Sequence, residues 1–206
     1  MSDLLIGQLS SAGVGDGASR APRGCRYGEA AVTQAHGRYQ DAVDRGAVFH
    51  ASLPAAVALG TALTATGVTF TLANPAGSGK NLVLLQATLA VVVGTTAGFV
   101  VYAVNNTPGQ VAVVYGTPLA AGIHNAMLGA GDASIAKVCS ACTLPAAPIV
   151  LRVMAGIIST TPGGVHSIVD DIGGAIVLPE NTAITVQGIT TNATGVISMM
   201  WEEVTP

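Results

Sequence analysis

Hydrophobic and polar residues alternate in short runs through most of the chain after residue 50. Residues 183–189 alternate with period two, and residues 196–201 do so in part. This alternation is typical of strands that bury one face, and the Val, Ile, Thr and Leu that dominate the runs favour a pleated surface. The strands predicted in this way are residues 68–73, 82–93, 99–105, 111–115, 135–141, 149–154, 175–178, 183–189 and 196–203.

Turn-forming residues separate these runs. They include Asn105-Asn106-Thr107-Pro108-Gly109, Pro162-Gly163-Gly164 and Pro179-Glu180-Asn181. A succession of about eight or nine short strands without a reliable helix predicts a sandwich or a barrel. Because the strands are uneven and the loops long, we expect residues 49–206 to form a jelly-roll-type antiparallel β-sandwich, in preference to a lipocalin-like closed barrel.

Residues 1–48 have a different pattern, and we expect them to form an extended N-terminal arm. Residues 1–24 are rich in Gly, Ser and Ala, which is typical of a flexible lead-in. The residues Arg, Tyr, an acid, Ala and Val then occur twice, in 26–32 and again in 38–43. The second copy predicts a short helix over 38–45, with Tyr39, Ala42 and Val43 on one face. Such an arm either packs on its own domain or reaches a neighbouring subunit, and we favour the second.

Charge falls sharply after the arm. Ten charged residues lie in the first 50 positions, but only nine lie in the following 156. A soluble domain usually has charge on about a quarter of its residues, and this charge keeps its surface wet and unattractive to neighbours. The surface of residues 51–206 is therefore expected to be covered, either by lipid or by other protein.

Protein is the better of these two covers. The richest apolar stretch, residues 82–93, is interrupted by Gln86 and Thr88 and is shorter than the about 20 residues of a spanning helix. The first residues lack the basic region and apolar run of a signal peptide. The net charge of −3, without a basic stripe in the body, disfavours nucleic acid. We expect a surface buried in an assembly, with neither membrane nor nucleic acid as a partner.

Gly77-Ser78-Gly79-Lys80 resembles part of a phosphate-binding loop. That motif needs a Gly where this chain has Asn74, a Ser or Thr where it has Asn81, and a helix afterwards. A strand is predicted here instead. We therefore interpret these residues as an ordinary loop between two strands.

The pair Cys139 and Cys142 has the spacing of a redox or zinc motif. Two further ligands at suitable spacing are missing, and residues 139 and 142 of one strand point to opposite faces. Buried, unpaired cysteines are the favoured interpretation, with a disulfide and a metal site as alternatives.

Catalytic motifs are scarce. The adjacent acids Asp170 and Asp171 precede Ile172-Gly173-Gly174, where acids usually cap a turn; metal binding or acid–base catalysis is the alternative. A cupin-type metal enzyme would need clustered His and acid ligands, whereas His50, His124 and His166 are expected in separate loops. We therefore expect no enzyme activity, no metal and no cofactor.

Several segments resemble those of small virion proteins of tailed bacteriophages. They are Arg26-Tyr27-Gly28-Glu29, Gly37-Arg38-Tyr39, Asp44-Arg45-Gly46-Ala47-Val48-Phe49, residues 74–82, and the hairpin at 177–186 with a closing strand that contains Trp201-Glu202. The similarity spans roughly residues 25–205. It implies a jelly-roll structural protein without catalytic residues, often trimeric, that acts as a cement or decoration protein on the capsid.

The resemblance gives three expectations for partners and sites. The partners would be further copies of the chain, in a homotrimer, and the major capsid protein, with the protein located at the capsid surface of the virion. An arm that contacts capsid subunits would use the Arg and Tyr side chains that interfaces enrich. These candidate contact residues are Arg26, Tyr27, Arg38, Tyr39 and Arg45.

A second function from another class remains open. Jelly rolls also serve as lectins, so a tail, fibre or baseplate module that binds a host receptor or glycan is the alternative. Glycan sites usually need exposed aromatic residues, and only 4% of this chain is aromatic. The location of the protein in the particle, on the head or on the tail, separates the two functions.

Overall fold

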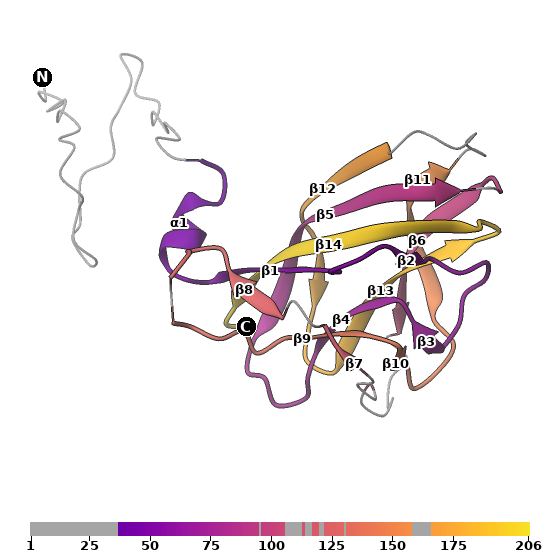
Figure 1. The fold of residues 1–206 in the computed structure, drawn as a ribbon. Coiled ribbons are helices and arrows are strands. Elements are labelled where there is room, and N and C mark those ends of the chain that lie inside the picture. The colour runs from indigo at the N-terminus through magenta and orange to yellow at the C-terminus, as the bar shows by residue number, and fades with distance from the viewer. Residues whose placement is uncertain are drawn as a thin grey trace, which may run out of the picture. The chain divides into compact units, whose positions relative to one another are not determined.

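The computed structural model describes residues 37–94, 96–105, 113, 117–119, 122–129, 131–157 and 166–206. Two compact units are distinguished, Met1–Asp41 and Ala42–Pro206. The second unit is nearly all β (Figure 1). Its strands are β1 (Val48–Ser52), β2 (Val57–Ala58), β3 (Thr66–Val68), β4 (Phe70–Asn74), β5 (Asn81–Gly94), β6 (Gly98–Asn105), β7 (Thr117–Pro118), β8 (Ile123–Asn125), β9 (Lys137–Ser140), β10 (Cys142–Thr143), β11 (Ile149–Ile157), β12 (His166–Leu178), β13 (Thr182–Ile189) and β14 (Ala193–Val204).

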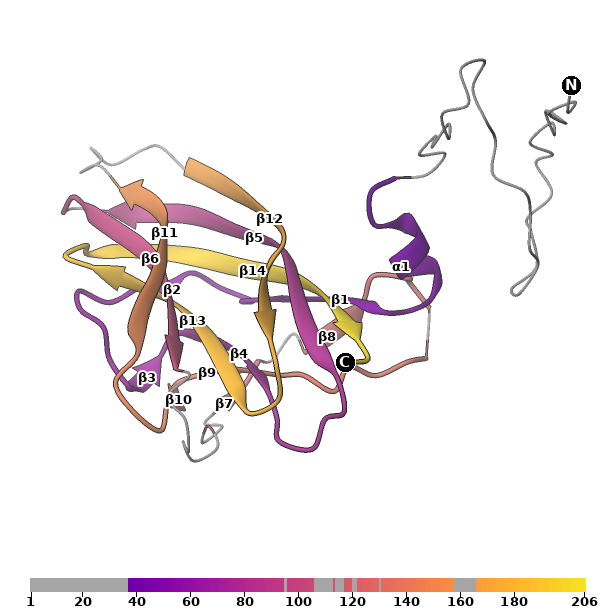
Figure 2. The ribbon, with the colours of Figure 1, turned by 180° about the vertical axis from the view of Figure 1, so that it is seen from behind.

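Two antiparallel sheets of six strands face each other, as the view from behind also shows (Figure 2). Sheet 1 has the order β12-β5-β14-β1-β8, with β2 added beside β14, and sheet 2 has the order β11-β6-β13-β4-β9-β7. The long strands alternate between the sheets along the chain, except that β6 and β11 are neighbours in sheet 2, so that β12-β5-β14-β1 lies opposite β11-β6-β13-β4. This arrangement is the two-sheet, eight-strand order of a jelly roll, and it confirms the fold class expected from the sequence.

The core lies between the sheets, where the inward side chain of every second residue is buried. Burial alternates strictly along β14, in the period that the sequence predicts. Trp201 stacks on Phe49 of the neighbouring strand, with ring centroids 6.4 Å apart. The largest fully buried side chains are Trp201, Tyr102, Phe70, Leu59, Leu72, Leu82, Leu84, Leu89, Ile184, Ile197, Met199 and Val48.

Sheet 2 is covered on its outer face as well. A second apolar cluster of Val68, Ala73, Leu144 and Ala183 lies there. Gln187 holds the segment before β3 in place: its Oε1 accepts a hydrogen bond from the Thr64 N–H at 2.8 Å, and its Nε2 donates to the Thr64 carbonyl at 3.1 Å. This second layer explains why β4 and β13 are buried on both faces.

The backbone of the segment before β3 lies very close to the backbone of β13 at Gly188. The Gly188 N–H donates to the Leu59 carbonyl at 2.6 Å, and a Cβ at position 188 would lie 2.4 Å from the Gly60 carbonyl oxygen. Only glycine fits at a contact of this kind. The loop before β3 is therefore specified by a residue more than a hundred positions away in the sequence.

The predicted helix is present in shorter form, as α1 (Gln40–Asp44). Ala42 is buried, as the expected helical face requires. The division between the two units falls after Asp41, and β1 already begins at Val48. The predicted strand at 111–115 lies largely outside the described residues.

The sequence interpretation of Asp170 and Asp171 as turn caps is wrong. Both residues lie inside β12, which runs through Gly173 and Gly174 instead of ending there. The two glycines have positive φ angles of 58° and 88°, and the register against β5 shifts between Asp171 and Ile176. The Gly-Gly pair thus forms a bulge within a strand, where a turn was expected.

Candidate functional site

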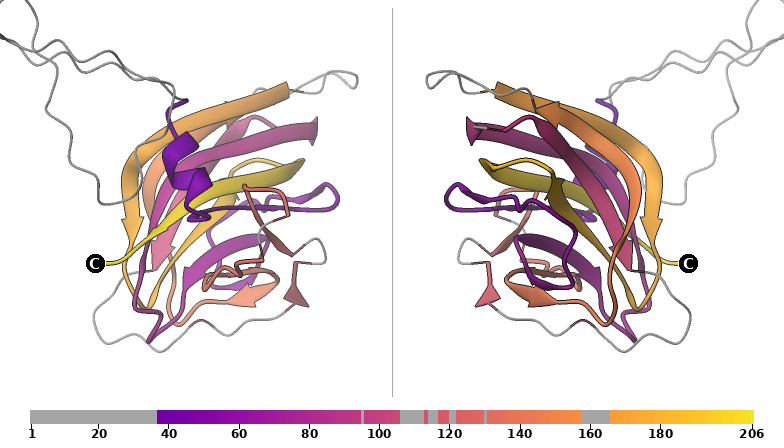
Figure 3. Two further views of the ribbon diagram at one scale, coloured as in Figure 1. Left: turned by 90° about the vertical axis from the view of Figure 1, so that its left-hand side faces the viewer. Right: turned by 90° about the vertical axis from the view of Figure 1, so that its right-hand side faces the viewer.

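The two long edge strands of the sandwich lie on the same side of the domain. β12 ends sheet 1 and β11 ends sheet 2, and the two strands, both orange in Figure 3, run along one side. We call this side the open edge. At the opposite ends of the two sheets, β8 has three residues and β7 has two. A long exposed edge strand presents a row of unpaired backbone groups, which natural monomers usually shorten or cover.

Exposed apolar side chains are concentrated on the open edge. Within the described residues, six of the eleven exposed large hydrophobic side chains belong to β11 or β12, each 44–60% exposed. They are Ile149, Val150, Leu151, Val153, Val169 and Val177. β11 contains no Lys or Pro, the residues that commonly protect an edge. The open edge therefore has the composition of an interaction surface.

A charged cluster joins the two strands of the open edge. The Arg152 guanidinium on β11 donates to both carboxylate oxygens of Asp170 on β12, at 2.6 Å to Oδ1. The Tyr102 hydroxyl on β6 donates to Asp170 Oδ2 at 2.9 Å, and the guanidinium carbon lies 5.5 Å from the centre of the Tyr102 ring. Burial, together with the hydrogen bond to Asp170, raises the pKa of Tyr102 above its ordinary value. The cluster therefore links sheet 1 to sheet 2 at the open edge.

A pocket of about 410 Å³ lies beside this cluster, between β12 and sheet 2. Apolar side chains dominate its wall, including Val104, Leu151, Ile176 and Leu178, and Arg152 lies at its polar end. Such a pocket suits an aliphatic side chain or an extended apolar segment.

Most charges in the body of the protein are bound within the chain. The carboxylate of Glu203 is fully buried: it pairs with Lys80 Nζ at 3.1 Å and accepts hydrogen bonds from Ser134 Oγ at 2.5 Å and the Ile135 N–H at 3.0 Å. Arg152 and Asp170 pair at the open edge. Of the nine charged residues after position 50, these pairs and the contacts of Glu180 and Glu202 engage six.

The loop that resembles a phosphate-binding motif is a structural turn, as the sequence indicated. It connects β4 to β5, and a strand follows it. The N–H groups of Gly77 and Gly79 donate to the Glu180 carboxylate at 3.1 and 2.5 Å. An internal anion therefore already occupies the donors that a phosphate would need.

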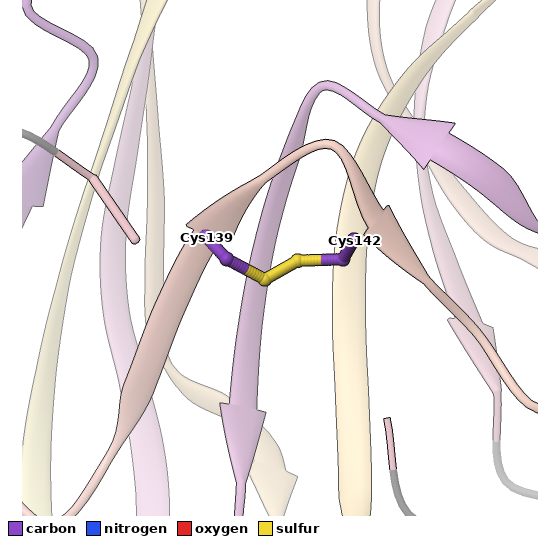
Figure 4. The surroundings of a disulfide bond; sticks show 2 residues. All are labelled: Cys139 and Cys142. Atoms are coloured by element: carbon purple, nitrogen blue, oxygen red, sulfur yellow. A yellow bond between two sulfur atoms is a disulfide. The ribbon is translucent and has the colours of Figure 1, made fainter. Parts of the chain in front are cut away.

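Cys139 and Cys142 are buried, as expected, but they are joined in a disulfide, which the sequence interpretation ranked second (Figure 4). The argument that the two side chains must point apart assumed a continuous strand. Ala141 instead has a left-handed φ of 56° and separates β9 from β10, so both side chains turn toward each other. The Cα–Cα distance of 6.0 Å is in the usual range for a disulfide.

The candidate arm residues are distributed as follows. Arg26 and Tyr27 lie outside the described residues. The Arg38 guanidinium lies 5.1 Å from the centre of the Tyr39 ring, a cation–π contact between neighbours in the arm. Arg45 binds β14 of its own domain, through Glu202 at 3.4 Å, although its side chain remains 62% exposed. Their role as contacts to a capsid remains a prediction.

The three histidines of the cupin alternative lie in strands, contrary to the expectation of loops. His50 of β1 is directly opposite His124 of β8, whereas His166 begins β12 at the other end of sheet 1. In the part of the chain that the structure describes, no three His, Cys, Asp or Glu side chains form a group able to hold a metal ion. Within the same part, no helix is long and apolar enough to cross a bilayer.

Comparison with known proteins adds no relative: the chain matches no family model, no curated protein and no solved structure.

The open edge was missed by the sequence interpretation. A signal was present, because Ile149-Val150-Leu151-Arg152-Val153-Met154 is apolar at both odd and even positions. A strand of this composition is either central or a docking edge, and only the sheet order distinguishes the two.

Proposed function

We propose that this chain is a non-enzymatic virion structural protein, a trimeric cement or decoration protein that stabilises a phage head by binding neighbouring capsid subunits. The observation that carries the proposal is the combination of a jelly-roll domain with few charges and an edge of two long strands that expose apolar side chains. Most of those few charges are bound inside the chain, so the surface that remains favours burial against protein.

The mode of action follows from this surface. Apolar burial stabilises contacts by about 25 cal/mol per Å² without requiring chemistry. A closed trimer presents every capsid-binding patch three times, so weak contacts combine into strong attachment. The N-terminal arm adds further contact area when it binds, and its Arg and Tyr side chains suit the anchoring role.

The location of the protein in its particle tests this proposal. Antibodies against the full chain, coupled to gold, should label the heads of intact particles produced by the source of the chain, and mass spectrometry should detect the protein in purified particles. Label on the tail would support a tail, fibre or baseplate module instead. Absence from purified particles would overturn the proposal.

The arm can be tested on the same particles. We expect a variant with Arg26→Ala, Tyr27→Ala, Arg38→Ala and Tyr39→Ala to bind particles that lack the protein at least tenfold more weakly than the unmodified chain does. The matched control is Arg20→Ala with Arg23→Ala, which removes arm charge outside the repeated pattern. Equal binding by all three proteins would exclude a role for the repeats in docking.

A further inference from the structure

We propose that the disulfide between Cys139 and Cys142 is a redox-controlled latch on a hinged flap of the domain. The flap consists of β3 (Thr66–Val68) and β10 (Cys142–Thr143), which pair with each other and lie over the outer face of sheet 2. In the oxidised chain the latch holds the flap against sheet 2, and in the reduced chain the flap is released. The inference goes beyond the proposed function and does not depend on it.

The flap continues two strands of sheet 2. One residue, Thr69, separates β3 from β4, and one residue, Ala141, separates β9 from β10. β4 pairs with β9 in the same antiparallel sense in which β3 pairs with β10. The four strands therefore form one ribbon that bends at its middle, and the bend is the hinge of the flap. The Thr69 hydroxyl, which donates to the Ala58 carbonyl at 2.8 Å, anchors this hinge.

The disulfide can form only when the ribbon is bent. In a straight strand, residues 139 and 142 would be about 10 Å apart and would point to opposite faces. Their Cα atoms are instead 6.0 Å apart, within the range that a disulfide spans, and the bond closes the base of the bend (Figure 4). Formation of the bond is therefore coupled to closure of the flap, so oxidation favours the bent ribbon and reduction removes that preference.

The backbone at the hinge opposes the bend. Ala141 has a φ of 56°, in the left-handed region that is unfavourable for residues other than glycine. The extended conformation of an ordinary strand has no such cost. The disulfide thus holds the ribbon against a local preference for a straighter path.

The face under the flap has the composition of a surface that can meet water. The side chains of β4 and β13 that point away from the main core are small or polar and buried: Thr71, Ala73, Ala183, Thr185 and Gln187. The Thr71 hydroxyl has no hydrogen-bond partner in the part of the chain that the structure describes, and water would supply one when the flap opens. Antiparallel sheets commonly keep one face polar for contact with water. Opening therefore uncovers a face that tolerates solvent.

The other attachments of the flap are modest. The apolar cluster beneath it contains four buried side chains, Val68, Ala73, Leu144 and Ala183, and two of them are alanines. Two hydrogen bonds between Gln187 and the backbone of Thr64 hold the segment before β3. Because apolar stabilisation scales with buried area, this cluster contributes less than the main core does. The flap should therefore open while the sandwich stays folded.

A dithiol reductant opens the latch by thiol–disulfide exchange. A thiolate of dithiothreitol attacks one sulfur of the protein disulfide, the S–S bond breaks, and a mixed disulfide forms; the second thiol of the reductant then displaces the protein sulfur. The protein gains two electrons and two protons as two thiols, and the dithiol becomes a cyclic disulfide. Because Cys139 and Cys142 are only 1% and 0% exposed, the attack requires a transient opening of the flap.

Hydrogen exchange followed by mass spectrometry tests the latch on the full chain. Reduction should raise the exchange rate of the amides in residues 64–68 and 142–144 by about tenfold, because a two-stranded ribbon is only marginally stable by itself. β5 and β14 should keep their rates. The variant with Cys139→Ala and Cys142→Ala should show the fast pattern with or without reductant. Cys25→Ala is the matched control, because it removes a thiol outside the latch, and it should respond to reduction as the unmodified chain does.

Two outcomes would overturn the latch. The first is equal exchange of the flap in the oxidised and reduced chains, which would show that the flap stays closed without the bond. The second is an equal rise in β5, β14 and the flap, because the disulfide would then stabilise the whole domain and not a hinged part of it.

A substitution at the hinge separates the bend from the bond. Glycine adopts a left-handed φ without steric cost, so Ala141→Gly in the variant that lacks both cysteines should slow exchange of the flap by about threefold. Ser140→Gly in the same background is the matched control, one residue before the hinge, and should not slow it. If Ala141→Gly leaves the exchange as fast as before or makes it faster, the hinge at this residue is excluded.

Discussion

The two edges of the sandwich differ in the length of their strands and in the side chains that they expose. On the side of β1 and β8, the final strand is short, Asn125 Nδ2 donates to the Gly46 carbonyl at 2.8 Å, and the Ala126 N–H donates to the Val48 carbonyl. We call this side the closed edge. On the open edge, long strands carry half-exposed valines around one charged cluster. The same fold therefore ends one edge with a short strand and polar contacts and the other with long strands that carry half-exposed apolar side chains.

The largest effect is expected at the core beside the closed edge. Trp201→Ala removes a fully buried ring that stacks on Phe49, and the cavity should lower the free energy of unfolding by about 3–5 kcal/mol. Urea denaturation followed by circular dichroism measures the loss. Trp201→Phe is the matched control: the Trp201 Nε1 has no hydrogen-bond partner among the described residues, so Phe loses volume but no bond and should cost much less. If Trp201→Phe lowers the free energy of unfolding as much as Trp201→Ala does, the indole N–H contributes a hydrogen bond to the folded state.

The next effect concerns the buried carboxylate that holds the end of β14. Glu203→Gln removes the charge that pairs with Lys80 and weakens the bonds from Ser134 and Ile135. A charge-assisted hydrogen bond in such a site contributes about 1.5–3 kcal/mol, so we expect a loss of about 2 kcal/mol in the same denaturation assay. Glu202→Gln is the control, because its pair with the largely exposed Arg45 should contribute less than about 0.5 kcal/mol. If the two variants lose equal stability, burial does not strengthen the Glu203 contacts.

A smaller effect is expected at the open edge. Asp170→Asn removes the partner of Arg152, and because the guanidinium is partly exposed the loss of stability should be about 1 kcal/mol. The more specific readout is Tyr102. Its pKa should fall toward the ordinary value, yet stay above it, because burial is the larger cause of the shift. Ultraviolet absorbance during alkaline titration measures this change. Asp171→Asn, on the opposite face of β12, should leave the Tyr102 titration as it is; an equal change there would contradict the assignment to Asp170.

The smallest effect is a dependence on pH at the closed edge. Loss of water around the His50 ring lowers its pKa below the ordinary value of 6.5. The unfolded chain therefore binds a proton more readily than the folded chain does, and stability should decrease slightly as pH falls below about 6.5. His50→Gln should flatten that part of the stability curve, measured as the unfolding midpoint between pH 7.5 and 5. A slope unchanged by this substitution would assign the dependence to another group.

The sequence predicted the strands whose pattern is local. β5 is a long apolar run and was found within one residue of each limit. β14 alternates without interruption and was found within one residue of its end and three of its start. The first half of β12 was missed because its Asp and Gly pairs have the composition of a turn. These residues are extended only because the strand pairs with β5. The disulfide was ranked below unpaired cysteines because the backbone reversal at Ala141 has no signal in that residue type.

The candidate site was less accessible from sequence than the fold. The deficit of charge was visible in the composition, and it predicted that the surface is covered. Which apolar side chains lie at an edge depends on the strand order, because β11 is apolar enough to be a central strand and becomes an edge only through the topology. The internal pairing of Lys80 with Glu203, 123 positions apart, is likewise a property of the fold alone.

Because so many of the few charges are neutralised inside the chain, little electric field extends beyond the surface of the domain. Approach to any partner is then undirected until the surfaces touch, so association should proceed at the ordinary rate for unsteered proteins, about 10⁵–10⁶ M⁻¹s⁻¹, and change little with salt. Contacts made by apolar surface weaken as water is cooled. Cold, rather than high ionic strength, is the condition under which an assembly built from this domain should loosen first.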